Sequence, residues 1–368
     1  MIIKRFKADN FRNIEKCDIE FSPGVNLLYG KNAQGKTNVI EGIYYFSRGK
    51  SFRGREDKEL IRFGTEGFRI YIEYEDNCGK ESLEYALFGK ERLRKKNDYK
   101  ISRITEMIGS FKAVLFYPDD LSLVKDGPEE RRGFLNVAAS SCYPLYIKYY
   151  SDYKKALENR NCILKMMQKG LYIDKNELDS WSASMAEYAS HIYIFRKDYI
   201  DRLKKYAGVI LKDISDGKEE LTLSYESQIP DGLTDRAEIK AEYERILSSS
   251  LDREIAAGVT LFGPHRDDVG IEINGKSARS FASQGQQRSI VLALKLSEGE
   301  VIKEVSGEYP VFLFDDVLSE LDEKRRSYVL NGIGERQIII TSCEPDECLG
   351  FTDSEIEVTG GRYVSTHR

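Results

Sequence analysis

Residues 30–37 combine two glycines, a lysine and a threonine at a spacing that suits the binding of phosphate groups. The octapeptide Gly-Lys-Asn-Ala-Gln-Gly-Lys-Thr fits the pattern G-x-x-x-x-G-K-[ST] without a mismatch. In such a loop, consecutive backbone N–H groups point inward toward an anion. Lys36 can then reach the β- and γ-phosphates of a nucleotide, and the Thr37 hydroxyl can ligate Mg²⁺. We therefore expect the whole loop to bind ATP, namely Gly30, Lys31, Asn32, Ala33, Gln34, Gly35, Lys36 and Thr37.

The segments on either side of this loop supply the context that the motif needs. Residues 25–29 form a short apolar run, as in a buried strand, and residues 37–46 place apolar side chains at helical spacing. A helix that opens at Gly35 adds about half a positive charge at its N-terminus. Glycine-rich octapeptides also occur by chance in turns, but the flanking strand and helix favour a nucleotide site.

A second candidate site follows the apolar run 311–314, which ends in Asp315 and Asp316. A continuous apolar run is typical of an interior parallel strand, and ligands bind at the carboxyl edge of such strands. We expect Asp315 to bind Mg²⁺ and Asp316 to orient the attacking water. A strand that merely ends in an aspartate turn is the alternative, and the phosphate loop argues against it because such loops work with an acidic partner. Thr341 ends another buried run and is expected to sense the γ-phosphate, so Lys36, Asp316 and Thr341 are the expected catalytic residues.

Two further elements are candidates for nucleotide contact. Ser283, Gly285 and Gln286 precede a helix and build a second anion site. One chain seldom needs two such sites for one triphosphate, which favours a role on the nucleotide of a neighbouring copy. Arg12 is expected on a loop after the first strand, where a nucleotide contact and a solvated loop arginine are about equally probable.

Composition excludes several classes of protein. The chain has 368 residues, of which 41% are hydrophobic and 32% charged, as in a globular protein with a large core. No apolar run approaches the roughly 20 residues that span a bilayer, and residues 1–6 resemble a first strand, not a signal peptide. The six cysteines show no metal-ligand pairing. These features predict a cytoplasmic protein without a membrane partner.

The overall charge does not indicate nucleic-acid binding, because 61 acidic residues outnumber 56 basic ones and give a net charge of −5. Any DNA contact must come from local patches. The densest cationic run lies within residues 90–103 and is either a stripe that follows a phosphate backbone or a solvated edge guarded by lysines. The segment 263–268, which contains His265, is either a chemical site or an ordered loop with internal ion pairs.

The pattern along the chain predicts an α/β protein with three segments: residues 1–120 as the N-terminal part of an ATPase lobe, 121–255 as a helical lobe, and 256–368 as the C-terminal part of the ATPase lobe. Alternating runs at 68–74 and 82–88 predict a hairpin, and residues 269–276 predict another around an Asn-Gly turn. The helical lobe is expected to be interrupted at Gly170, Gly208, Gly217 and residues 230–232. No heptad register continues through these breaks, so no long coiled coil is expected.

With these motifs in this order, the whole chain resembles the RecF family of DNA recombination and repair proteins, which are ABC-type ATPases related to SMC proteins. The resemblance rests on residues 10–13, 30–37, 51–53, 128–132, 263–268, 283–288 and 315–322. It implies a P-loop ATPase head with a mixed β-sheet core and an α-helical second lobe. It also implies that ATP and Mg²⁺ drive a homodimer, in which Ser283, Gly285 and Gln286 cap the nucleotide of the opposing subunit and Asp322 crosses the interface.

The same resemblance implies DNA as a partner, either duplex or a single-strand/duplex junction, and RecR and RecO as protein partners. Many SMC-type heads have glutamate where this chain has Asp316, and this shorter side chain predicts slow, DNA-stimulated ATP hydrolysis. No convincing Q-loop glutamine is found. A structural DNA tether of SMC type and a small-molecule P-loop kinase are the alternatives, disfavoured by the missing coiled coil and by the signature-like segment, respectively.

Overall fold

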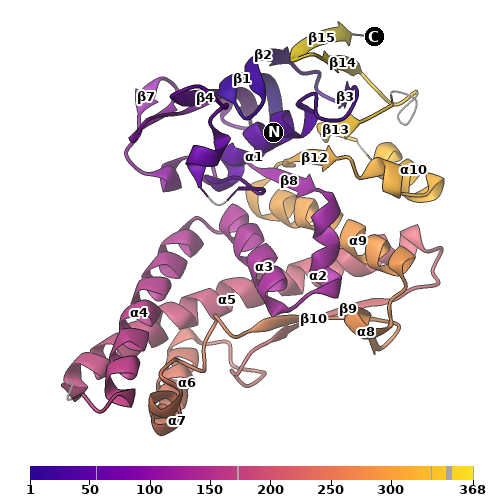
Figure 1. The fold of residues 1–368 in the computed structure, drawn as a ribbon. Helices are drawn as coiled ribbons and strands as arrows, with labels where there is room; N and C mark the ends of the chain where they lie inside the picture. The colour runs from indigo at the N-terminus through magenta and orange to yellow at the C-terminus, as the bar shows by residue number, and fades with distance from the viewer. Residues whose placement is uncertain (55, 172–173, 333, 345–349, 368) are drawn as a thin grey trace. The chain divides into compact units, whose positions relative to one another are not determined.

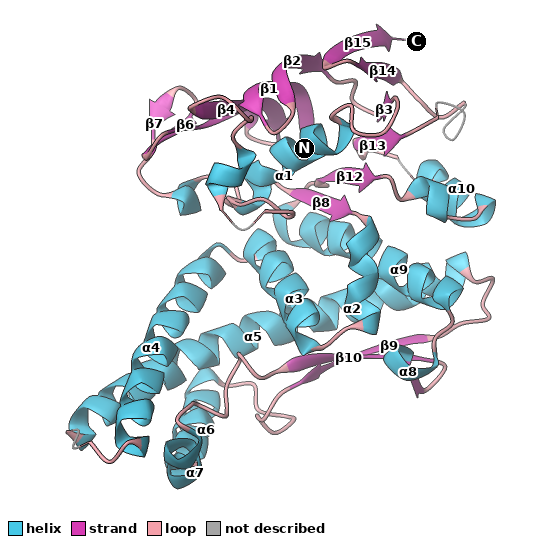
Figure 2. Ribbon diagram, in the orientation of Figure 1, coloured by secondary structure: helices cyan, strands magenta, loops and turns pink. Residues whose placement is uncertain are grey.

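The computed structural model describes residues 1–54, 56–171, 174–332, 334–344 and 350–367. Its chain divides into two compact units (Figures 1 and 2). Unit 1 consists of Met1–Leu121, Val209–Glu219 and Ser283–Arg368, and unit 2 of Ser122–Gly208 and Glu220–Ala282. Unit 1 therefore joins segments from both ends of the chain.

Unit 1 contains an antiparallel sheet of six strands in the order β2-β1-β4-β5-β6-β7. Its expected hairpin is confirmed, because Phe68 pairs with Leu87 and Tyr74 with Glu81. Apolar side chains on one face of these strands are buried, as alternation requires. The strands are β1 (Ile2–Phe11), β2 (Ile14–Glu20), β4 (Gly67–Asp76), β5 (Gly79–Phe88), β6 (Glu91–Lys96) and β7 (Tyr99–Lys100).

The second sheet of unit 1 has the order β15-β14-β3-β13-β12-β8, with all neighbours parallel except β14 and β15. Its central strands are buried along their whole length, which explains their continuous apolar sequences. The expected strands at 25–29 and 311–314 are both present, and the second extends to Asp315. The strands are β3 (Val25–Tyr29), β8 (Ala113–Phe116), β12 (Val311–Asp315), β13 (Ile338–Ser342), β14 (Ser354–Thr359) and β15 (Arg362–His367).

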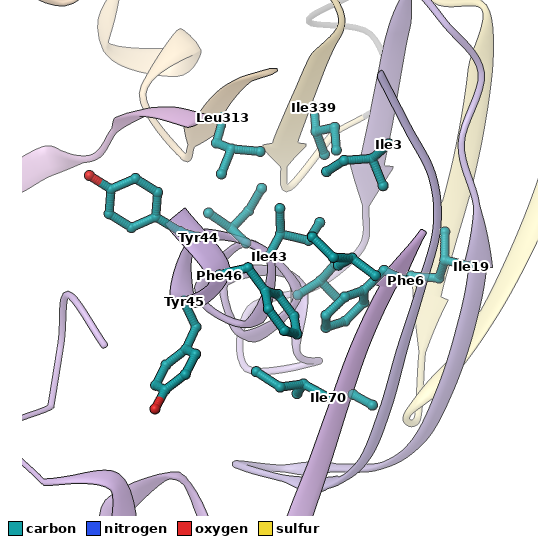
Figure 3. Close-up of a cluster of buried hydrophobic side chains, with 14 of the residues drawn as sticks. Ile3, Phe6, Ile19, Ile43, Tyr44, Tyr45, Phe46, Ile70, Leu313 and Ile339 are labelled. Carbon is teal, nitrogen blue, oxygen red and sulfur yellow. The ribbon is translucent and has the colours of Figure 1, made fainter. Parts of the chain in front are cut away.

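Helix α1 (Lys36–Arg48) lies between the two sheets of unit 1 (Figure 3). Leu313 and Ile339 cover one side of the helix, and Phe6, Ile19 and Ile70 cover the other, all in one buried cluster. Because both sides are covered, most of α1 is apolar and buried. The other helical elements of unit 1 are η1 (Asp57–Leu60), η2 (Ile104–Glu106), η3 (Pro118–Leu121), α9 (Gln284–Ser306), η4 (Leu318–Glu320) and α10 (Glu323–Asn331).

Unit 2 is mainly helical, as expected, and has a buried aromatic core that includes Tyr146, Tyr153 and Tyr243. It also contains a small sheet in the order β11-β10-β9. Its elements are α2 (Ser122–Lys125), α3 (Pro128–Cys142), α4 (Pro144–Gln168), α5 (Lys175–Ile214), β9 (Leu221–Glu226), α6 (Arg236–Ser249), α7 (Leu251–Ala257), β10 (Asp268–Ile273), β11 (Lys276–Ser277) and α8 (Ala278–Phe281), although the last residues of α5 are counted in unit 1.

Three details of unit 2 differ from the expectation. Strand β9 lies within the stretch expected to be helical, because Leu221 and Leu223 alternate with polar residues and pair with β10. Gly208 does not interrupt α5, and a Cβ there would lie 3.7 Å from the carbonyl oxygen of Leu221. Residues 256–282 pack with the helical segments rather than with the ATPase lobe, because β10 pairs with β9 and α7 contacts α4.

None of the helices within the described part of the chain is both long and apolar enough to cross a membrane.

Candidate nucleotide site

The loop between β3 and α1 has the backbone geometry of an anion cradle. Gly30, Ala33 and Gly35 have positive φ angles of 149°, 65° and 112°. A Cβ on Gly30 would lie 2.3 Å from the carbonyl oxygen of Val358, so only glycine fits there. Among the described residues, no side chain caps the start of α1 and no acidic residue lies in its first turn. The positive end of this helix therefore faces the loop without an internal anion, which fits a phosphate ligand.

Lys36 is folded over this loop. Its Nζ donates hydrogen bonds to the carbonyl oxygens of Gly30 and Lys31, the latter at 3.2 Å. The Sγ atom of Cys343 lies 3.9 Å from the same Nζ and donates to Oδ1 of Asn32 at 2.9 Å. Sequence reasoning did not place Cys343 beside the nucleotide loop. It follows β13, which pairs in parallel with β3, so the ends of both strands meet at one sheet edge.

The two aspartates lie at the same edge, at the end of β12. Asp315 is buried and accepts a hydrogen bond from Thr341 Oγ1 at 2.9 Å. Burial raises the pKa of Asp315, while hydrogen bonds with Thr341 and Thr37 oppose that shift. The structure thus brings Thr37 and Asp315 together, and both have oxygen atoms of the kind that Mg²⁺ prefers. In the described residues, no group of three or more His, Cys, Asp or Glu side chains could hold a metal ion.

Thr341 lies behind the aspartates and not on the surface of the cavity. Its side chain is buried, and its Oγ1 accepts from the backbone N–H of Asp316 at 2.9 Å while donating to Asp315. Asp316 has a φ of 52°, in the left-handed region. Thr341 therefore fixes the positions of both aspartates, and its expected contact with a γ-phosphate stays a prediction.

A buried carboxylate on α1 holds two arginines close to the loop. Glu41 is fully buried, and its oxygens accept from Nη2 and Nε of Arg12 at 2.7 and 3.0 Å and from Ser51 Oγ. Nη1 of Arg53 lies 3.8 Å from Glu41 and donates to Oδ1 of Asn38 at 3.1 Å. Sequence reasoning missed Glu41, although an acidic residue in the apolar stripe of a helix is a usable signal of a buried pair.

A cavity in unit 1 joins these groups. The residues lining it include Arg12, Lys36, Thr37, Arg53 and Asp316. The other lining residues are Asn13, Asn32, Ala33, Gln34, Gly35, Asn38, Glu59, Ile61 and Phe63. The structure therefore brings Arg12 and Asp316 to the phosphate loop. None of the described lining residues comes from 283–288.

Ser283, Gly285 and Gln286 instead form the start of α9, which begins at Gln284, so Gly285 and Gln286 lie within the helix and do not precede it as expected. Ser283 caps the helix by accepting from the backbone N–H of Gln286 at 3.3 Å, and Gln286 Oε1 accepts from the N–H of Ser283 at 2.9 Å. Arg325 of α10 donates to the Ser289 hydroxyl at 2.7 Å and to the Gly285 carbonyl at 3.2 Å. Asp322 caps α10 and pairs with Arg325.

Both of the other candidate segments contain internal ion pairs. In the cationic run, Arg92 pairs with Asp57, Lys95 with Glu84 and Lys96 with Glu81, which reduces the charge available to a phosphate backbone. In unit 2, Asp267 and Asp268 face Arg196 and Arg131 at 3.9 and 2.8 Å. His265 is held between Tyr153 and the carbonyl oxygen of Thr260. The segment 263–268 is thus an ordered loop with internal ion pairs.

Comparison with known proteins gives a consistent result over the whole chain. The profile of the RecF/RecN/SMC N terminal domain matches residues 2–360. The chain is 39% identical to the DNA replication and repair protein RecF of Clostridioides difficile, over 97% of this chain and 96% of that one. It is 38% identical to the protein of the same name from Acetivibrio thermocellus, over 98% and 99%.

Solved structures agree. The structure of the recombination mediator protein RecF-ATP in the RecFOR pathway matches with a TM-score of 0.92 and 34% identity, over 99% of this chain and 97% of that one. The Smc head domain from Pyrococcus furiosus, solved with an extended coiled coil and the C-terminal domain of ScpA, matches with a TM-score of 0.58 and 17% identity over 100% and 96%. This second match concerns the fold alone. Together they confirm the expected fold class, an α/β ATPase head with a helical second lobe.

Proposed function

The chain belongs to the RecF family, and from this premise we propose that it is a cytoplasmic, ATP-switched DNA-binding protein of replication and recombination repair. The observation that supports this most directly is the cavity that joins the loop 30–37 to Asp316 at the end of β12. A phosphate cradle beside the carboxyl edge of parallel strands is the arrangement that P-loop ATPases use.

Each residue of the site has a proposed task. The backbone of residues 30–35 and the start of α1 bind the phosphates, and Lys36 exchanges its bonds to the loop carbonyls for bonds to phosphate oxygens. Thr37 and Asp315 hold Mg²⁺, which when bound neutralises charge on the β- and γ-phosphates. Asp316 orients the attacking water and accepts its proton, because its carboxylate lines the same cavity. Thr341 positions both aspartates through its hydroxyl.

We further propose that a second copy of the chain completes the ATP-binding site. The start of α9, with Ser283, Gly285 and Gln286, does not line the cavity of its own unit among the described residues, and the positive end of this helix suits an anion from elsewhere. Because the nucleotide then contacts both copies, ATP favours the homodimer by binding it better than the monomer. Hydrolysis removes that link and releases the pair.

The biological role proposed for this switch is recognition of duplex DNA and of single-strand/duplex junctions, with RecR and RecO as partners in placing recombinase. Support comes from the solved RecF protein described as a recombination mediator in the RecFOR pathway. ATP hydrolysis is proposed to be slow, because the side chain of Asp316 is one methylene shorter than that of a glutamate. DNA is proposed to stimulate this hydrolysis. A switch needs only one hydrolysis event for each cycle of assembly and release.

Sedimentation of the full chain tests the switch. We expect a monomer without nucleotide and a dimer with ATP and Mg²⁺, and the shift should be larger with duplex DNA. Lys36→Arg should still bind nucleotide weakly but lose the dimer or its turnover. A chain that stays monomeric with ATP, Mg²⁺ and duplex DNA contradicts the proposal.

A mixing experiment separates a shared site from simple dimerisation. Lys36→Ala removes a contact with the phosphates. Ser283→Arg blocks the start of α9, which would contact the nucleotide of the other copy. Neither variant should therefore dimerise alone. A mixed pair retains one intact site, composed of Lys36 from the second variant and Ser283 from the first. Partial recovery of dimer and ATPase activity in the mixture is expected, and no recovery would exclude a site shared between copies.

A further inference from the structure

An aromatic side chain extends from the wall of the nucleotide cavity. Phe63 is fully exposed, at 102% of its reference area, and it lines the cavity together with Ile61, Arg12 and residues 32–37 of the loop. A single exposed phenylalanine indicates little by itself. Its place is informative, because Phe63 and Ile61 are the only large apolar side chains among the described residues that line the cavity, and the other large side chains there are polar or charged.

The backbone holds Phe63 in a fixed position. Residues 62–65 form a turn in which the N–H of Thr65 donates to the carbonyl oxygen of Arg62 at 3.1 Å, and Gly64 has the positive φ of 84° that the third position of a type II turn requires. The N–H of Arg62 donates to the carbonyl oxygen of Asn10 at 2.9 Å, and Ile61 bridges to Phe11. The turn is therefore attached to the end of β1, and Phe63 is presented on a supported turn.

The phosphate loop that lines the same cavity indicates which ligand group could lie against this ring. The loop 30–37 takes the phosphates, so the apolar part of the same ligand must lie elsewhere along the wall. A nucleotide has one flat apolar group, its base, and bases stack on aromatic side chains. We propose that Phe63 stacks on the nucleobase of the bound triphosphate, with Ile61 at the side, and so provides the base subsite of the cavity; this rests on the proposed binding of ATP.

Stacking uses the face of the ring and makes no hydrogen bond to the base edge. It therefore raises the affinity for every base, and Phe63 alone should discriminate little between ATP and GTP. Because Phe63 is fully exposed, its removal takes no apolar contact from the core. Phe63→Ala should therefore fold like the wild type, which makes it a clean test.

The experiment compares ATP with inorganic tripolyphosphate, which has the phosphates without the base, by calorimetry on the full chain with Mg²⁺. Phe63→Ala should bind ATP and GTP between about five-fold and a hundred-fold more weakly and should bind tripolyphosphate as the wild type does. Phe63→Trp should restore ATP binding, and its fluorescence should be quenched by ATP and not by tripolyphosphate. Phe88→Ala is the matched control, since Phe88 is exposed in the same unit and does not line the cavity.

Equal ATP affinity in Phe63→Ala and the wild type would overturn the base subsite while leaving the phosphate site intact. Equal losses for ATP and tripolyphosphate would also overturn it, because they indicate a disturbed loop. A loss confined to self-association at saturating ATP would overturn it in favour of a contact between copies. If the wild type binds neither ligand, both the proposed ATP site and the base subsite are contradicted.

Discussion

Arg12 and Glu41 form an ion pair with two hydrogen bonds, at 2.7 and 3.0 Å, between the turn after β1 and the buried side of α1. Glu41 is one helical turn beyond Thr37, so the pair connects the loop that carries Arg12 to the helix whose start forms the phosphate cradle. Arg12 also donates to the carbonyl oxygen of Glu59 at 2.8 Å. The pair thus links β1, η1 and α1 at one wall of the cavity.

Removing Glu41 should destabilise the fold and weaken nucleotide binding. Glu41→Ala leaves Arg12 without its buried partner, and we expect the free energy of unfolding to fall by about 3 kcal/mol. A double-mutant cycle with Arg12→Ala, measured by urea unfolding, should give a coupling energy of about 2 kcal/mol. The exposed pair Arg62–Glu15, 3.2 Å apart, is the control and should give no more than about 0.5 kcal/mol. Equal coupling in the two cycles would contradict a structural role for the buried pair.

Asp316→Asn should separate ATP binding from hydrolysis. Asparagine tolerates the left-handed φ of 52° as well as aspartate does, so the backbone should not change. The amide cannot accept a proton from water, and we expect the ATPase rate to fall at least about a hundred-fold with ATP affinity retained. Asp315→Asn, by comparison, should weaken Mg²⁺-dependent ATP binding itself. Unchanged turnover in Asp316→Asn would remove this residue from the catalytic assignment.

Acidification should destabilise unit 2 through His265. The Thr260 carbonyl can only accept, so Nε2 of His265 carries the proton and Nδ1 accepts from the Tyr153 hydroxyl at 2.6 Å. Burial, together with Arg266, Arg132 and Arg196, lowers the pKa of His265 to about 4. Between pH 6.5 and 4 the unfolded chain therefore binds more protons at this residue, and the contribution of His265 to the free energy of unfolding should fall by about 3 kcal/mol as the pH drops through this window.

The measurement uses Trp181, which lies in unit 2 and is the only tryptophan of the chain. Between pH 7 and 4, the free energy of unfolding of the wild type, measured by urea unfolding with the fluorescence of Trp181, should decrease relative to that of His265→Gln. The pKa of Asp267 is raised to about 6 by burial, so this carboxyl group acts in the opposite direction between pH 6 and 4 in both proteins. Parallel pH profiles would show that His265 stays neutral or makes no contribution.

ATP should protect Cys343 from alkylation. Its exposed thiol lies 3.9 Å from Nζ of Lys36 and contacts Asn32 of the loop, so phosphates in the cradle would restrict access to it. We expect saturating ATP with Mg²⁺ to slow the reaction of Cys343 with iodoacetamide several-fold, as followed by peptide mass spectrometry. Cys78, exposed on the turn between β4 and β5, is the internal control and should react at the same rate with and without ATP.

The parts of the site that the sequence predicted are those formed by residues close together in the sequence. The loop 30–37 and the aspartates after residues 311–314 each combine a spacing with an apolar strand, and both patterns can be recognised without knowing the fold. The role of Glu41 depends on its contacts with Arg12, Ser51 and Arg53, and only the tertiary structure brings these residues together. The position of Cys343 beside the phosphate loop can be inferred only when β13 is known to pair with β3. The exposure of Phe63 likewise depends on the turn that attaches it to β1, and no periodic pattern marks it.

The position of α1 between two sheets also constrains how this protein can respond to a ligand. Ile43 and Phe46 are completely buried and pack in the same cluster as residues of both sheets, so the helix cannot slide or tilt without opening voids on one side and clashes on the other. The cradle at its start is therefore a fixed reference point. Discrimination between nucleotides with two and three phosphates must come from the peripheral segments that surround the cradle. We expect any conformational change on nucleotide binding to occur in those segments.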